Sequence, residues 1–153
     1  MATIKPKTIV QLKLDGTCVS HTRTDVSARD LKMTIDEPVE RGGTNLSLTP
    51  TETLMAALLG CTNVIAHRVG ETHGVHFKSM RLRLEADLDR RGVTLAEEIA
   101  VPFPRATLFI EVATDADEAS LAKVKRDLGK YCPLSKVVRQ AGTRLEEVWS
   151  VRS

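Results

Sequence analysis

The chain is poor in aromatic residues: Phe, Trp and Tyr make up 3% of its 153 residues. Proteins that bind single-stranded nucleic acids stack bases on several aromatic side chains, so we expect no binding of that kind. The formal charge is only +2, and basic residues are interspersed with acidic ones along residues 81–91. The sequence therefore shows no basic patch of the kind that binds DNA or RNA. The composition therefore argues against a nucleic-acid partner.

Long apolar runs are also missing. No segment has the roughly 18 consecutive apolar residues of a membrane helix. The N-terminal residues MATIKPKTIVQLKLDG lack the apolar stretch and the small-residue cleavage site of a signal peptide. Three cysteines are an odd number, and the chain is too large to need disulfides for folding. We expect a cytoplasmic protein that makes no contact with membranes.

Motifs for metals and phosphates are absent from the sequence as well. There is no CxxC or HExxH pattern, and the spacing of His67, His73 and His76 does not place them on one helical face. A glycine-rich phosphate loop and a serine nucleophile elbow are also lacking. We therefore expect neither a bound metal nor a resident cofactor.

The sequence does contain enough aliphatic side chains for a core. Hydrophobic residues make up 42% of the chain, which predicts one compact domain over residues 1–153. Hydrophobic alternation and β-branched residues predict strands, with Asp15-Gly16 as a hairpin turn between the first two. The predicted strands cover residues 9–14, 17–24, 31–35, 80–88, 107–113 and 147–151.

A long helix is predicted from Thr49 to about Gly74. Thr49 is a good N-cap, Pro50 suits the first helical position, and Glu52 completes a capping box. This helix is apolar nearly all round, so we expect it in the core or in a subunit interface. A second helix is predicted over residues 119–128. The order is three strands, helix, two strands, helix and strand, which is an α+β pattern.

Two cysteines are candidates for chemistry. Cys132 precedes Pro133, which suits the first position of a helix, so its thiol would feel the helix dipole and have a lowered pKa. The alternative is a small buried residue. Cys61 lies inside the long helix, where a core role is favoured unless a positive group such as an arginine comes close. Cys18 is interpreted as structural.

Two segments resemble the OsmC/Ohr family, in particular its OsmC-like branch. They are DEPVERGGTNLSLTPTETLMAALLGC, residues 36–61, and YCPLSKVV, residues 131–138. The resemblance extends over roughly residues 25–152. It implies an intertwined homodimer whose long central helices pack between β-sheets.

The resemblance also implies a site and a reaction. Cys61 would attack the O–O bond of a hydroperoxide and become a sulfenic acid, and Cys132 would condense with it to a disulfide. An external dithiol would reduce this disulfide, so no cofactor is implied. Arg29 is expected to stabilise the Cys61 thiolate, with Arg23 as the second choice and Arg41 as the third.

One position departs from the family pattern. Peroxidases of the family often carry Glu directly after the helix-opening proline, where it holds the arginine. Here Thr51 has that place and the acid is Glu52, one residue later, which rotates the side chain by about 100° around the helix. Glu52 is therefore expected either to position the arginine or only to close the capping box.

The leading hypothesis is a thiol peroxidase that reduces organic hydroperoxides or hydrogen peroxide. The alternative is a protein of the same scaffold that binds a small ligand or senses redox state without turnover. A third possibility is a structural dimer with inert, buried cysteines, which would react slowly with thiol reagents.

Overall fold

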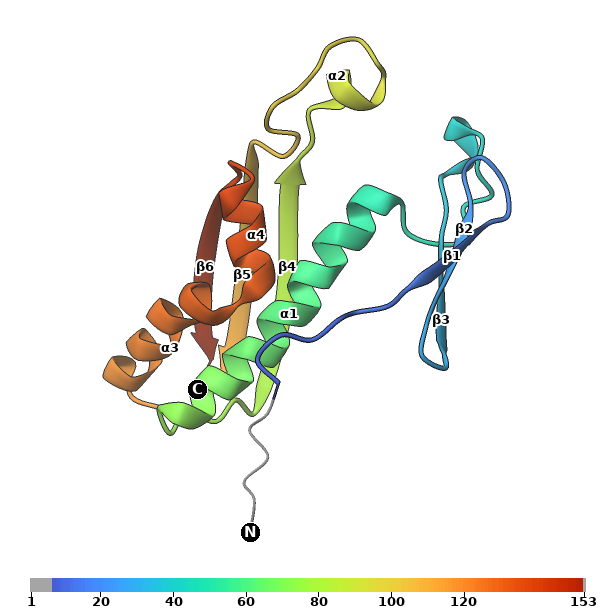
Figure 1. Ribbon diagram of the computed structural model, residues 1–153. Coiled ribbons are helices and arrows are strands. Elements are labelled where there is room, and N and C mark those ends of the chain that lie inside the picture. Colours follow the sequence, from blue (N-terminus) through green and yellow to red (C-terminus); the bar gives the residue numbers. More distant parts are fainter. Residues whose placement is uncertain (1–6, 153) are drawn as a thin grey trace. The chain divides into compact units, whose positions relative to one another are not determined.

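The computed structural model describes residues 7–152 (Figure 1). The chain divides into two compact units, Met1–Thr53 and Leu54–Ser153. That both units form one OsmC-like domain stays a prediction. Among residues 7–152, no helix is both long and apolar enough to cross a bilayer.

The first unit contains a three-stranded antiparallel sheet in the order β1-β2-β3. Its strands are β1 (Asp15–Cys18), β2 (Thr24–Ala28) and β3 (Leu31–Ile35). A two-residue turn, Arg29-Asp30, joins β2 to β3. The prediction of β3 is confirmed with its bounds. A short 3₁₀ helix, η1 (Val39–Arg41), follows the sheet.

The predictions for the first two strands were wrong. Residues 9–14 form no strand, and Asp15-Gly16 lies within β1 rather than in a turn. The turn comes after Cys18, inside the second predicted strand. The Ser20 hydroxyl accepts hydrogen bonds from the backbone amides of Thr22 and Arg23, and this local bonding forms the turn.

The segment after β3 is organised by a buried carboxylate. Asp36 is fully buried and accepts hydrogen bonds from the amides of Glu37, Thr44 and Leu46 and from the Thr44 hydroxyl. Hydrogen bonding, first from that hydroxyl, lowers the Asp36 pKa to about 2. Gly43 is also required here, because a Cβ atom would lie 1.8 Å from the Glu37 carbonyl oxygen. These contacts fix the chain between β3 and the long helix.

The predicted long helix is confirmed as α1 (Pro50–Thr72). Its capping box is formed: the Thr49 amide donates to Glu52 Oε2 at 2.9 Å, and the Glu52 amide donates to Thr49 Oγ1 at 3.2 Å. Gly74 follows with a φ of 68°, the left-handed conformation that commonly ends a helix.

The second unit has a mixed sheet in the order β4-β5-β6. β4 pairs antiparallel with β5, and β5 pairs parallel with β6. A parallel pair needs a crossover, which α3 and α4 provide. The elements are β4 (Ser79–Asp87), α2 (Arg90–Val93), β5 (Arg105–Ala113), α3 (Glu118–Tyr131), α4 (Pro133–Gln140) and β6 (Arg144–Arg152). The α+β class is therefore confirmed.

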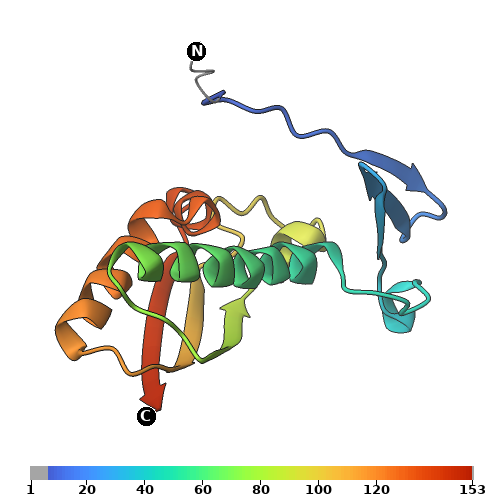
Figure 2. The same cartoon turned by 90° about the horizontal axis from the view of Figure 1, so that it is seen from below.

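Helices α1, α3 and α4 lie on one side of this sheet (Figures 1 and 2). Every second residue of β5 points toward them and is buried, from Ala106 to Val112. These side chains form a core with residues from the three helices and β6: Leu58, Ala66, Leu128, Cys132, Val138 and Leu145. The opposite face of the sheet carries mostly polar residues, as the alternation of β4 predicts.

Candidate active site

Cys61 and Cys132 lie side by side in the second unit. Cys61 is on α1, and Cys132 is at the junction between α3 and α4. Their sulfur atoms are 3.3 Å apart, with the Cys132 thiol donating to the Cys61 sulfur. Both are free thiols; Cys61 is partly exposed and Cys132 is buried. The fold thus brings together two nucleophiles separated by 71 residues in the sequence.

Cys132 is held from both sides. Its amide donates to the Leu128 carbonyl at 2.9 Å, which closes α3, and its carbonyl accepts from the Lys136 amide at 3.1 Å, which opens α4. Pro133 occupies the first turn of α4, so the predicted N-cap position of Cys132 is confirmed. The second thiol is therefore presented by rigid backbone.

The surroundings of Cys61 affect its ionisation in opposite directions. Burial among apolar side chains raises the pKa of the Cys61 thiol, and the neighbouring Cys132 raises it further. Hydrogen bonding from the Leu134 backbone acts the other way and lowers the pKa. Burial is the larger effect. The Cys61 thiol therefore needs a positively charged group nearby, in addition to the Leu134 backbone, to become an efficient nucleophile.

The Leu134 amide was missed by sequence reasoning. The CysPro pattern indicated a helix N-terminus, and its effect was assigned to Cys132. Within the described residues, the Cys132 side chain makes no capping hydrogen bond, and hydrogen bonding from the Leu134 backbone lowers the pKa of Cys61. A backbone group leaves no residue-type signal, so only the fold could identify it.

The remaining candidates belong to the first unit. Arg29 is exposed in the β2–β3 turn with a φ of 58°, Arg23 pairs with Asp25 at 2.9 Å, and Arg41 pairs with Glu37 at 2.6 Å.

The acid at the helix start, Glu52, closes the capping box, and the hydrogen bond from the Thr49 amide is the first cause of its lowered pKa. Its role toward an arginine stays a prediction, as does the role of Arg29 toward Cys61.

Cys18 belongs to the first unit, and two histidines of the second unit have other partners. Cys18 ends β1 and is exposed. His73 Nε2 is 2.8 Å from Asp127 Oδ2, which links the end of α1 to α3, and His67 packs edge-on against Phe77. Within residues 7–152, no three His, Cys, Asp or Glu side chains are grouped closely enough to hold a metal ion.

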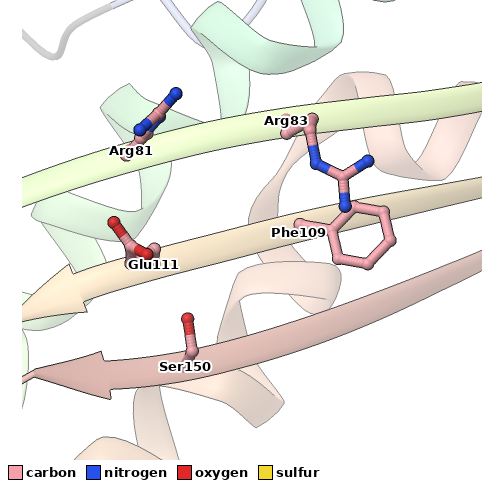
Figure 3. A pocket seen from close by; sticks show the side chains of 5 residues that line it. All are labelled: Arg81, Arg83, Phe109, Glu111 and Ser150. Atoms are coloured by element: carbon pink, nitrogen blue, oxygen red, sulfur yellow. The ribbon is translucent and has the colours of Figure 1, made fainter.

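A shallow pocket of about 290 Å³ lies on the outer face of the second sheet (Figure 3). The Arg83 guanidinium covers the Phe109 ring at 3.8 Å, and Glu111 pairs with Arg152. Neither cysteine of the close pair lines this pocket, so it is not the thiol site.

A comparison of the sequence with protein families identifies a family for this chain. Residues 43–147 match the family described as OsmC-like protein. The chain belongs to the OsmC-like family. The matched segment contains both Cys61 and Cys132. A comparison with curated proteins gives no match.

Solved structures share this OsmC-like fold at low sequence identity. An OsmC-like protein from Mycoplasma pneumoniae superposes with a TM-score of 0.79 at 10% identity, covering 94% of this chain and 99% of that one. An organic hydroperoxide resistance protein OsmC from Legionella pneumophila gives 0.67 at 14% identity, covering 95% and 100%. The organic hydroperoxide resistance protein OhrB of Bacillus subtilis gives 0.60 at 15%, covering 92% and 98%.

Proposed function

We propose that this protein is a thiol peroxidase that reduces organic hydroperoxides or hydrogen peroxide. The Cys61 thiolate attacks the O–O bond, takes one oxygen as a sulfenic acid, and the second oxygen leaves as an alcohol or water after protonation. The Cys132 thiol then displaces water from the sulfenic acid and forms the Cys61–Cys132 disulfide. An external dithiol reduces the disulfide and is itself oxidised, so no bound cofactor takes part.

The observation that carries this proposal is the 3.3 Å distance between the two sulfur atoms. A disulfide has an S–S distance of about 2.0 Å, so a small side-chain movement would join the pair. Exposure divides the roles: the partly exposed Cys61 can meet a peroxide, whereas the buried Cys132 is sheltered from it. Similarity to organic hydroperoxide resistance proteins supports the same substrate class.

An arginine is proposed to provide the charge that the Cys61 thiolate needs. Burial raises the Cys61 pKa, and a guanidinium opposes such a shift by favouring the charged form. Our choice is Arg29, because it is exposed and because, among the described residues, it has no ion-pair partner. Glu52 is proposed to position this arginine in addition to capping α1.

We propose that the active species is a cytoplasmic homodimer joined along α1. One side of this helix from Leu54 onward exposes apolar or small residues at helical spacing: Leu54, Ala57, Gly60 and Val64. A second copy would cover this stripe. Gly60 has no atom within 4 Å of the position of a Cβ atom, so a partner helix could approach closely there.

The test is steady-state peroxide consumption with a dithiol reductant. The wild type is expected to turn over, Cys61→Ser to lose at least about a hundredfold in rate because the nucleophile is gone, and Cys18→Ser to behave as wild type. Cys132→Ser is expected to stop at the sulfenic acid unless the dithiol reduces it directly. A wild type that is oxidised once but never cycles would overturn the proposal and favour the redox-sensing alternative.

A further inference from the structure

The pocket on the outer face of the second sheet is not used by the proposed thiol chemistry (Figure 3). It is lined by Arg81 and Arg83 from β4, Phe109 and Glu111 from β5, and Ser150 from β6. Strand pairing places Arg83 opposite Phe109. Glu111 lies between Arg81 on one neighbouring strand and Ser150 on the other. The register of three strands thus brings five side chains to one place on the sheet surface.

One guanidinium in this pocket has no acidic partner. Glu111 lies opposite Arg81 in the strand register, but its carboxylate pairs with Arg152 instead. Among residues 7–152, the Arg81 side chain forms neither an ion pair nor a hydrogen bond, and the Ser150 hydroxyl forms no hydrogen bond. The pocket therefore offers a cation and a hydroxyl group that are both available to a ligand.

The charge around the pocket matches a ligand with a single negative charge. Arg83 pairs with Glu85, which leaves that pair neutral. Glu111 is neutralised in the same way by Arg152. The charge of Arg81 is then the one that remains, and a monoanion balances it, whereas a phosphate dianion would leave a negative charge beside Glu111. A planar guanidinium can donate two parallel hydrogen bonds to a carboxylate, so a carboxylate fits best.

The pocket also offers a surface for a flat apolar group. The Arg83 guanidinium lies 3.8 Å from the centroid of the Phe109 ring, and the Arg83 side chain is exposed. Guanidinium groups are weakly hydrated and stack on aromatic faces, so a second ring can stack on the exposed side of Arg83. Val148 lies opposite Phe109 on β6 and is also exposed. A ligand with an aromatic body would cover this surface.

We propose that this pocket binds a small monocarboxylate with a flat apolar body, such as an arylacetate. Its carboxylate pairs with Arg81 and accepts a hydrogen bond from the Ser150 hydroxyl, and its ring stacks on Arg83 over Phe109. Neither thiol of the close pair lines the pocket, so the inference does not depend on the proposed peroxidase function.

The test is a titration of the reduced, ¹⁵N-labelled protein with phenylacetate, followed by NMR. The spectra record the backbone amides and the Nε–H groups of the arginines. We expect saturable shifts at Arg81, Arg83, Phe109 and Ser150, and none at the thiol pair. Shifts that do not saturate, or that centre on the thiol pair, would overturn the proposal.

Variants on the outer face identify the groups that bind. Arg81→Gln should weaken phenylacetate binding at least about tenfold, because the carboxylate loses a charged hydrogen-bond donor. Ser150→Ala should weaken it by less, about threefold, because a neutral donor is lost. The matched control is Arg105→Gln, which removes a positive charge from the same face outside the pocket. Equal losses in Arg81→Gln and Arg105→Gln would show a general attraction of anions and would contradict a site.

Two further probes test the class of ligand. 2-Phenylethanol lacks the charge of phenylacetate, and phenyl phosphate is doubly charged at pH 8. We expect phenylacetate to bind more tightly than either. Equal binding of 2-phenylethanol would contradict the role of Arg81, and tighter binding of phenyl phosphate would overturn the assignment to a monocarboxylate.

Discussion

At the scale of single residues, the proposed chemistry depends on which groups stabilise the Cys61 thiolate. Thr49-Pro50 and Cys132-Pro133 mark helix starts, so the sequence placed Cys61 inside a helix and Cys132 at a helix N-terminus. A chemical role for Cys61 was implied only by the family resemblance. The sequence could not reveal that the sulfur atoms are 3.3 Å apart, since that distance results from packing across 71 residues. It also gave no sign that the Leu134 backbone lowers the pKa of Cys61, against the effect of burial.

Arg29 gives a prediction at this scale. If its guanidinium stabilises the Cys61 thiolate, Arg29→Gln should raise the pH midpoint of Cys61 alkylation and slow the peroxide reaction at pH 7 by about tenfold. Arg29→Lys should retain part of the rate because it keeps the charge. Stopped-flow oxidation of the reduced protein measures the rate.

The control is Arg23→Gln, which breaks the pair with Asp25. A loss of rate in this variant but not in Arg29→Gln would move the role to Arg23. Loss in neither variant would reject both arginines.

At the scale of elements, local signals succeeded where they were redundant. Four signals predicted the bounds of α1: the N-cap Thr49, Pro50 at the first helical position, the capping box closed by Glu52, and Gly74 at the end. The strict alternation of apolar and polar residues predicted β4. The predicted position of the first hairpin turn was wrong, because Asp-Gly only favours a turn and does not require one. The turn forms instead where the Ser20 hydroxyl accepts hydrogen bonds from the amides of Thr22 and Arg23.

The loop between β3 and α1 gives the second prediction. The Asp36 pKa is lowered from 3.8 to about 2, so the ionised carboxylate stabilises the folded state above pH 4, and this contribution is lost as the pH falls toward 2. Asp36→Asn should lower the urea midpoint at pH 7, since the amide has fewer acceptor sites for four donors. The difference from wild type should shrink by pH 3.

Asp30→Asn, in the exposed β2–β3 turn, serves as the control and should have little effect at either pH. An Asp36→Asn deficit that is as large at pH 3 as at pH 7 would show that the charge of Asp36 is not what stabilises the loop.

At the scale of the whole molecule, the order of the predicted strands and helices indicated the α+β class. The division into two units was not predicted, since no linker-like segment marks the boundary at Thr53 within α1. Local sequence patterns also do not predict how two copies of the chain assemble. The structural feature that suggests a homodimer is the exposed apolar stripe on α1.

This stripe gives the third prediction. Gly60→Leu should improve the intrinsic stability of α1 by roughly 0.8 kcal/mol and yet dissociate the homodimer, because the larger side chain blocks a close helix approach. Light scattering coupled to gel filtration measures the mass. Ala122→Leu, on the exposed side of α3, is the matched control and should leave the dimer intact. A Gly60→Leu protein that remains dimeric would remove α1 from the interface.

The measurement that tests the central claim most directly is mass spectrometry of the reduced protein after one equivalent of an alkyl hydroperoxide, with and without dithiothreitol. The account predicts rapid formation of a Cys61–Cys132 disulfide that dithiothreitol reverses, with Cys18 unmodified. Two unreacted thiols after the peroxide treatment would contradict it.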